Sequence, residues 1–265
     1  MAPFQVFDYA SISVTLFFFA LGSIFDLRKR EVSDKVWLLY GPIGLALIIA
    51  RTLVEPSEVF LTILSIGITA GVSLGLFYFG LFGGADAKAM ICLGLSIPLF
   101  PTSYDPLLGY LHPFFPIMVV VSGFLLSISV AIWIGFRNLF EFLAKGSKMF
   151  EGLGGEPEWK KAVAFLVGYP ADVSRLISSF YLYPLEEVVE DSTGARRKFR
   201  LFFNAEADRD DMVSKLVGSL PKVGSPSKVW VSPGLPLLLF FLIGLVVTLI
   251  AGDLVFSAVL LLVAT

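Results

Sequence analysis

The chain is built from long apolar runs separated by short polar segments. A helix needs about 20 apolar residues to cross the hydrocarbon core of a bilayer. Runs that approach this length lie near residues 10–25, 36–50, 59–82, 87–99 and 116–136, and a last apolar block covers 235–264. The pattern therefore predicts about six membrane-spanning helices, of which the fourth is short and the last is interrupted at Gly252 and Asp253.

The segment between the fifth and sixth apolar runs has a different pattern. Its periodicity predicts helices over 157–167 and 208–217, and two β-rich runs, 179–190 and 196–204, flanking a turn at 191–194. The stretch from Pro221 through 224–227 is typical of a linker that returns to the membrane. We therefore expect a small α+β domain at 137–231, between a membrane domain at 1–136 and a last transmembrane segment at 232–265.

Composition supports an α-helical integral membrane protein. Of the 265 residues, 56% are hydrophobic and only 16% are charged, which excludes disordered and coiled-coil chains. The net charge of −2 leaves no basic field to hold nucleic acid. With one cysteine (Cys92) and one histidine (His112), the chain cannot form an internal disulfide or a Cys/His metal centre, so we expect no metal and no cofactor.

The distribution of basic residues predicts the orientation of the helices. If the N-terminus lies outside the cell, the inner segments 26–35, 83–88 and 137–230 hold 19 of the 20 Lys and Arg residues. Arg51 alone then lies on the outer side. By the positive-inside rule we expect the 137–231 domain to be cytosolic.

Two aspartates are the candidate catalytic residues, because a carboxylate beside an apolar span is costly. Asp26 follows the first run and Asp86 lies between the third and fourth, so both are predicted at the cytosolic face. Each also has a purely structural interpretation. Asp26 would pair with Arg28 or Arg30, and Asp86 would cap the fourth helix.

The residues around Asp86 are candidates for substrate binding or support. Gly83 and Gly84 have no side chain, so an extended substrate backbone would be able to approach, although a tight turn between helices also needs glycine. Lys88 would lower the pKa of an aspartate pair or orient substrate, or would only anchor the helix end. Asp8, Asp105 and Asp253 are predicted to be interfacial charges.

These motifs resemble a known family. The sequence from Gly83 to Asp86 resembles the GxGD signature of membrane aspartyl proteases, with Ala85 in place of the second glycine. Together with the stretch 23–32, it resembles the archaeal preflagellin and prepilin peptidases, relatives of the type IV prepilin peptidases. Shorter matching stretches lie at 115–118, 136–138 and 229–236. The cysteine-rich zinc segment of many bacterial relatives is absent from this sequence, so the resemblance implies peptidase activity alone.

The resemblance implies an aspartic endopeptidase in which Asp26 and Asp86 share one proton and activate water. Its implied substrates are archaellin or pilin-like precursors, whose short basic leader precedes a helix that lies in the lipid bilayer. Cleavage is then expected at the cytosolic membrane face.

Three other functions remain open from the residues. The two aspartates would suit a proton- or cation-coupled transporter, although such groups usually lie near the bilayer midplane in repeated halves. A presenilin-like intramembrane protease would use the same chemistry within the bilayer. A non-catalytic assembly subunit would tolerate loss of either aspartate.

Overall fold

The computed structural model describes residues 3–109, 112–191, 194–201 and 208–256 of the chain. It divides into two compact units, one formed by Met1–Ser127 with Pro236–Thr265, the other by Ile128–Leu235. The helix α5 (Phe115–Lys145) begins in the first unit and continues in the second. Each unit is described by itself.

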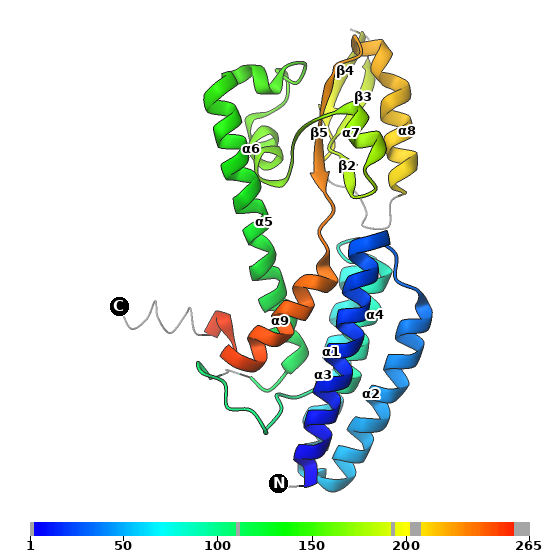
Figure 1. The fold of residues 1–265 in the computed structure, drawn as a ribbon, viewed down its shortest axis with the longest axis vertical. Helices are drawn as coiled ribbons and strands as arrows, with labels where there is room; N and C mark the ends of the chain where they lie inside the picture. Colours follow the sequence, from blue (N-terminus) through cyan, green and yellow to red (C-terminus); the bar gives the residue numbers. More distant parts are fainter. Residues whose placement is uncertain (1–2, 110–111, 192–193, 202–207, 257–265) are drawn as a thin grey trace, which may run out of the picture. The chain divides into compact units, whose positions relative to one another are not determined.

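The first unit is a bundle of helices (Figure 1). Besides the first part of α5 it contains α1 (Pro3–Lys29), α2 (Asp34–Val54), the short 3₁₀ turn η1 (Pro56–Glu58), α3 (Val59–Tyr78), α4 (Gly84–Ser96) and α9 (Leu237–Ala251). Helix α1 packs against α2 and α9, and α4 packs against α2 and α3.

Four helical segments are long and apolar enough to cross a membrane, so the chain is a multi-pass membrane protein. They are Phe4–Lys29, Asp34–Val54, Pro56–Tyr78 and Phe115–Ala144. The predicted fourth and sixth crossings correspond to α4 and α9, which have 13 and 15 residues and fall short of the usual length of a span.

Helix α3 is arranged for a lipid surrounding rather than for water. Its inward face carries small hydroxyl residues, Thr62, Ser65, Thr69 and Ser73, all of which are buried. The Ser65 hydroxyl donates to the carbonyl of Pro98, 2.5 Å away. Large side chains such as those of its first and last turns are exposed on the other face. Small polar residues between helices and large apolar ones outside are typical of membrane bundles.

The centre of the bundle is closely packed around α4. Tyr40 is fully buried and donates its hydroxyl to Thr15, 2.8 Å away. Gly44 of α2 lies so near α4 that a Cβ there would be 2.9 Å from the Cβ of Ser96. A glycine at this point lets the two backbones approach, which positions the helix that begins just before Asp86.

The second unit is an α+β region. It contains the end of α5, η2 (Gly146–Phe150), α6 (Glu158–Val167), β1 (Tyr169–Asp172), α7 (Val173–Ser178), β2 (Leu182–Pro184), β3 (Glu186–Asp191), β4 (Gly194–Phe199), α8 (Arg209–Ser219), η3 (Leu220–Val223) and β5 (Lys228–Pro233). An antiparallel sheet has the order β1-β5-β2, and β3 pairs with β4 as a separate hairpin.

Buried Glu186 ties the hairpin to the central strand. Its carboxylate accepts two hydrogen bonds from the Arg197 guanidinium, both of 2.7 Å, and one from the backbone N–H of Trp230, 2.5 Å away. Because these donors come from β4 and β5, one side chain joins the hairpin to the three-stranded sheet.

Several of the predicted elements of this unit are confirmed. Helices α6 and α8 match the predicted 157–167 and 208–217, and the hairpin of β3 and β4 lies where the β-rich runs were expected. Residues 192–193 of the predicted turn and 202–204 of the second run lie outside the described residues.

The sequence pattern did not predict the strand that follows the linker, Lys228–Pro233, which forms β5, the central strand of the sheet. A six-residue strand between glycine- and proline-rich stretches gives a weak sequence signal, and its strand state comes from pairing on both edges with β1 and β2.

Candidate functional site

Asp26 lies in the last turn of α1, with its side chain 15% exposed. One turn later, the Arg30 guanidinium is 3.7 Å from the Asp26 carboxylate, so the pairing considered from the sequence exists. Arg30 has φ of 56°, in the left-handed region, and its backbone N–H donates to the carbonyl of Asp26. This conformation ends α1 and keeps the arginine beside the aspartate.

The N-terminus of α9 also faces Asp26. The backbone N–H of Leu238, in the first turn of α9, stabilises the negative charge of the Asp26 carboxylate. Pro236 precedes this helix and supplies no side-chain acceptor for the first N–H groups. The start of a helix that lies more than 200 residues later in the chain therefore acts on Asp26.

Asp86 is held by the start of α4. The N-cap residue is Gly83, so Asp86 occupies the third helical position and is not itself the N-cap considered above. Its Oδ2 accepts a hydrogen bond from the backbone N–H of Gly83, 3.2 Å away. This return bond fixes the side chain at the end of the helix where the macrodipole favours a negative charge.

The helical start of α4 explains the departure from the GxGD signature. Gly84 and Ala85 form the first turn of α4, and Ala85 has no left-handed backbone, so its methyl group is accommodated without strain. The same helical geometry means that Gly84 and Ala85 do not present an extended backbone. Gly83 has φ of −73° and ψ of 160°, which other residues also adopt.

The structure brings Asp26 and Asp86 close enough for the charge of Asp26 to act on Asp86. Asp86 lies outside the four candidate spans and is partly buried. Burial and, to a smaller extent, the negative charge of Asp26 raise the pKa of Asp86, while the Gly83 N–H and the Arg30 charge oppose the rise, and the resulting pKa is about 7. The charge of one carboxylate therefore makes it harder to ionise the other.

Lys88 pairs with Asp34 and not with Asp86. Its Nζ lies 2.6 Å from the carboxylate of Asp34, at the start of α2, and both side chains are largely exposed. The cation that acts on Asp86 is Arg30. The sequence indicated Arg30 only as a partner of Asp26. It did not predict the effect of Arg30 on Asp86, because the backbone conformation of Arg30 cannot be read from the sequence.

Two buried polar atoms of α1 and α2 were not predicted from the sequence. Within the described ranges, the Ser23 hydroxyl and the Trp37 indole N–H are buried and have no hydrogen-bond partner. Ser23 lies one turn before Asp26, on the same face of α1. The spacing of three residues between Ser23 and Asp26 was the sequence feature that could have indicated that the two side chains share a face of α1.

The predicted interfacial role of Asp8 is wrong. Asp8 is 4% exposed and accepts a 2.8 Å hydrogen bond from Arg51, which also binds Glu58. The Ser103 hydroxyl donates to the second oxygen of Asp8. This network joins α1 to α2 and to the segment after α4, and its burial makes it structural.

The chemistry of the described residues offers no metal site. No group of three or more His, Cys, Asp or Glu side chains gathers within residues 3–109, 112–191, 194–201 and 208–256. Cys92 is buried against the Trp37 carbonyl, and His112 accepts a bond from the backbone of Phe114.

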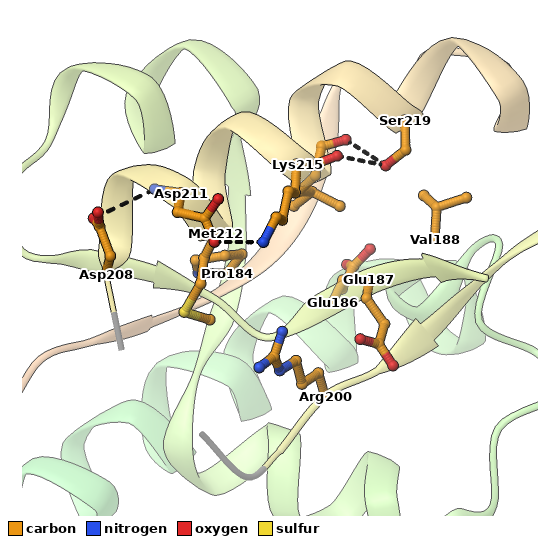
Figure 2. A pocket seen from close by; sticks show the side chains of 11 residues that line it. Pro184, Glu186, Glu187, Val188, Arg200, Asp208, Asp211, Met212, Lys215 and Ser219 are labelled. Carbon is orange, nitrogen blue, oxygen red and sulfur yellow. Dashed lines mark hydrogen bonds and ion pairs between the residues drawn. The ribbon is translucent and has the colours of Figure 1, made fainter. Parts of the chain in front are cut away.

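A separate hollow of about 420 Å³ lies in the second unit, between β3 and α8 (Figure 2). Its walls carry both signs of charge, including Glu187, Arg200, Asp211 and Lys215. Lys215 and Asp211 pair with each other across 2.6 Å. None of the predicted site residues lines this hollow.

Two family models match this chain. Residues 13–135 match the type IV leader peptidase family, and residues 160–254 match the archaeal peptidase A24 C-terminus of type II.

Three relatives are each named preflagellin peptidase. That of Methanocaldococcus jannaschii is 28% identical over 240 residues, 88% of this chain and 90% of the relative. That of Methanococcus maripaludis is 26% identical over 88% of this chain and 91% of its own length. That of Methanococcus voltae is 28% identical over 91% and 94%.

Proposed function

Because the chain belongs to the type IV leader peptidases of the peptidase A24 family, with the archaeal type II C-terminus, we propose that Asp26 and Asp86 are its catalytic pair. The activity is that of an aspartic-type preflagellin or type IV leader peptidase. The observation that carries the residue assignment is the electrostatic contact between two carboxylates on different helices, α1 and α4.

The pair works through one shared proton. The ionised carboxylate takes a proton from water, and the water oxygen attacks the carbonyl carbon of the scissile peptide bond. The protonated carboxyl donates to the carbonyl oxygen and then supports departure of the amine. Gly83 supports the pair through its N–H bond to Asp86, Gly84 by forming the first turn of α4, and Lys88 by joining α4 to α2 through Asp34.

The substrates are precursors of archaellins or pilin-like proteins with short basic leaders. Support comes from the relatives, which are named preflagellin peptidases over nearly the whole chain. In such a precursor the hydrophobic helix would occupy the bilayer, and the bond to be cut would lie at the membrane surface beside Asp26 and Asp86.

We place the N-terminus outside and the catalytic pair at the cytosolic face. In this arrangement α4, continued to residue 99, and α9 complete six crossings. Residues 1–136 then form the membrane domain, 137–231 the cytosolic domain and 232–265 the last segment. The distribution of Lys and Arg supports this orientation.

The test is processing of a preflagellin or prepilin precursor by membranes that contain the wild type, Asp26→Asn or Asp86→Asn. Each substitution alone is expected to abolish cleavage while the protein still inserts. Asp105→Asn is the matched control, because Asp105 is exposed and remote in sequence from both aspartates. Cleavage retained by either of the first two variants would remove that aspartate from the mechanism.

The orientation is tested separately by labelling of introduced cysteines near residues 26 and 86. Both are expected to react from the cytosolic side only. Labelling from opposite sides would end the two-aspartate proposal. Proton uptake by reconstituted protein without any cleavage would favour the transporter instead.

A further inference from the structure

The two candidate aspartates are held by different kinds of partner. Asp26 faces the Arg30 guanidinium at 3.7 Å and the Leu238 N–H at the N-terminus of α9. A cation and the positive end of a helix both stabilise a carboxylate over a carboxylic acid. Burial acts against the charge of Asp26, and these two groups oppose that effect.

Asp86 has a weaker set of partners. Its Oδ2 accepts one bond from a neutral donor, the Gly83 N–H at 3.2 Å. Within the part of the chain that the structure describes, Asp86 forms no ion pair with Lys or Arg. It also feels the negative charge of Asp26. The start of α4 favours a negative charge on Asp86, but burial and the charge of Asp26 oppose it, so the proton is favoured on Asp86 when Asp26 is ionised.

We propose that Arg30 is a positioning residue that fixes the roles in the pair, so that Asp26 acts as the base and Asp86 as the acid. The proposal rests on the catalytic pair proposed above and adds the direction in which the proton moves. Arg30 acts through Asp26, by keeping its carboxylate ionised and oriented.

The proton balance follows from this assignment. The Asp26 carboxylate takes a proton from water as the water oxygen bonds to the carbonyl carbon, while Asp86 gives its proton to the carbonyl oxygen. When the C–N bond of this intermediate breaks, Asp26 returns its proton to the departing amine. One hydroxyl proton of the intermediate goes back to Asp86. One water is consumed, and the products are a carboxylic acid, an amine and the starting pair.

The backbone of Arg30 supports a specific role for this residue. Its φ of 56° is uncommon for any residue except glycine, and glycine is the usual residue where a helix ends in this way. Here a long cationic side chain occupies the position and lies 3.7 Å from Asp26. Strained positions of this kind are often found at functional sites.

The other charged residues considered near this end of the bundle are exposed, or are paired with each other. On α1, Arg28 and Lys29 are exposed, and on α2, Lys35 is exposed. The charges of Asp34 and Lys88 are engaged with each other. The sequence of α9, Leu237–Ala251, carries no charged residue. The charge that acts on Asp26 is Arg30, and those that act on Asp86 are Asp26 and Arg30.

The experiment measures kcat/KM for precursor cleavage from pH 4 to 9 with the full-length protein in proteoliposomes. The variants are Arg30→Gly, Arg30→Gln and Arg30→Lys. Arg30→Gly removes the cation at a backbone position that glycine prefers, so folding is expected to be retained. Arg28→Gln is the control, since it removes the same charge from an exposed residue of the same helical turn.

For the wild type, the rate is expected to rise at low pH as Asp26 ionises and to fall at high pH as Asp86 loses its proton. Arg30→Gly and Arg30→Gln should shift the low-pH limb of the kcat/KM profile to higher pH by about one unit. At a fixed pH on that limb, this shift is about a tenfold loss of rate. The high-pH limb should move less. Arg30→Lys should lie between these variants and the wild type, and Arg28→Gln should match the wild type.

Three results would overturn the proposal. The first is a low-pH limb in Arg30→Gly that coincides with that of Arg28→Gln. The second is a larger movement of the high-pH limb, which would reverse the roles of Asp26 and Asp86. The third is a change in KM alone with both limbs unmoved, which would assign Arg30 to substrate contact. All three require wild-type cleavage, whereas failure of the wild type to cleave any precursor would reject the proposed function itself.

Discussion

Lys88 of α4 and Asp34 of α2 form an ion pair of 2.6 Å that links the helix of one candidate catalytic residue to its neighbour. The side chains are 46% and 68% exposed. An exposed pair of this kind contributes about 1 kcal/mol or less. Because Lys88 lies two residues after Asp86, this ion pair is a good place to test whether a charge near the site is structural or catalytic.

Lys88→Ala is therefore expected to keep at least part of the wild-type activity, and Asp34→Ala should behave alike. In the double variant the two effects should overlap, because both single changes remove the same contact. Cleavage rates and thermal unfolding of the four proteins check this. An inactive Lys88→Ala beside an active Asp34→Ala would instead mean that Lys88 acts on the substrate.

The stability of the protein should depend on pH through Asp86. Burial raises the pKa of Asp86 from 3.8 to about 7, so between these pH values the folded chain keeps a proton that the unfolded chain releases. Stability is then highest below about pH 4 and falls as pH rises to about 7. Asp86→Asn removes this cost and should be more stable than the wild type at pH 8, by on the order of 1–2 kcal/mol given its partial exposure.

Thermal unfolding of both proteins in detergent at pH 5 and pH 8 measures this difference. The gain should be larger at pH 8 than at pH 5. Asp105→Asn, at an exposed position, should show no such trend. An Asp86→Asn variant that is equally stable, or less stable, at pH 8 would contradict the raised pKa.

Gly44→Ala should damage the packing that positions α4. The added Cβ would lie 2.9 Å from the Cβ and 3.1 Å from the Cα of Ser96, so the α4 backbone has to move. Overpacking of this kind costs about 1–3 kcal/mol, and activity should fall with stability because α4 carries Asp86.

Gly71→Ala on α3 is the matched comparison. A Cβ at Gly71 meets nothing within 4 Å, so unfolding temperature and cleavage should stay near those of the wild type. If both alanine variants behaved alike, the close approach of α2 and α4 would not be what holds the site.

Arg51→Gln should destabilise the bundle strongly. Asp8 would be left buried without its 2.8 Å partner, and breaking a buried ion pair costs about 3–5 kcal/mol. Adding Asp8→Asn should restore part of the loss, because the uncompensated charge is gone. The yield of folded protein and its unfolding temperature check both variants, with exposed Lys35→Gln as control. A double variant worse than Arg51→Gln would contradict this explanation.

Much of the second unit was predictable because its elements have local signals. The helix α6 has an amphipathic pattern, and Asp208 caps α8 through its side chain, as the acidic start of that segment indicated. Strand β5 had no such signal. Its state depends on two partner strands that lie more than 40 residues earlier in the chain.

The sequence by itself determined that this is a multi-pass helical membrane protein with carboxylates at the ends of apolar runs, because hydrophobic length and charge placement are local properties. It also predicted the two aspartates. Only the tertiary structure decided which groups surround each of them. The α9 N-terminus at Asp26 and the pairing of Lys88 with Asp34 depend on how helices remote in sequence pack together, and the left-handed backbone at Arg30 was not predicted from the sequence. Electrostatic surroundings are set by distance in space, which periodicity along the chain does not encode.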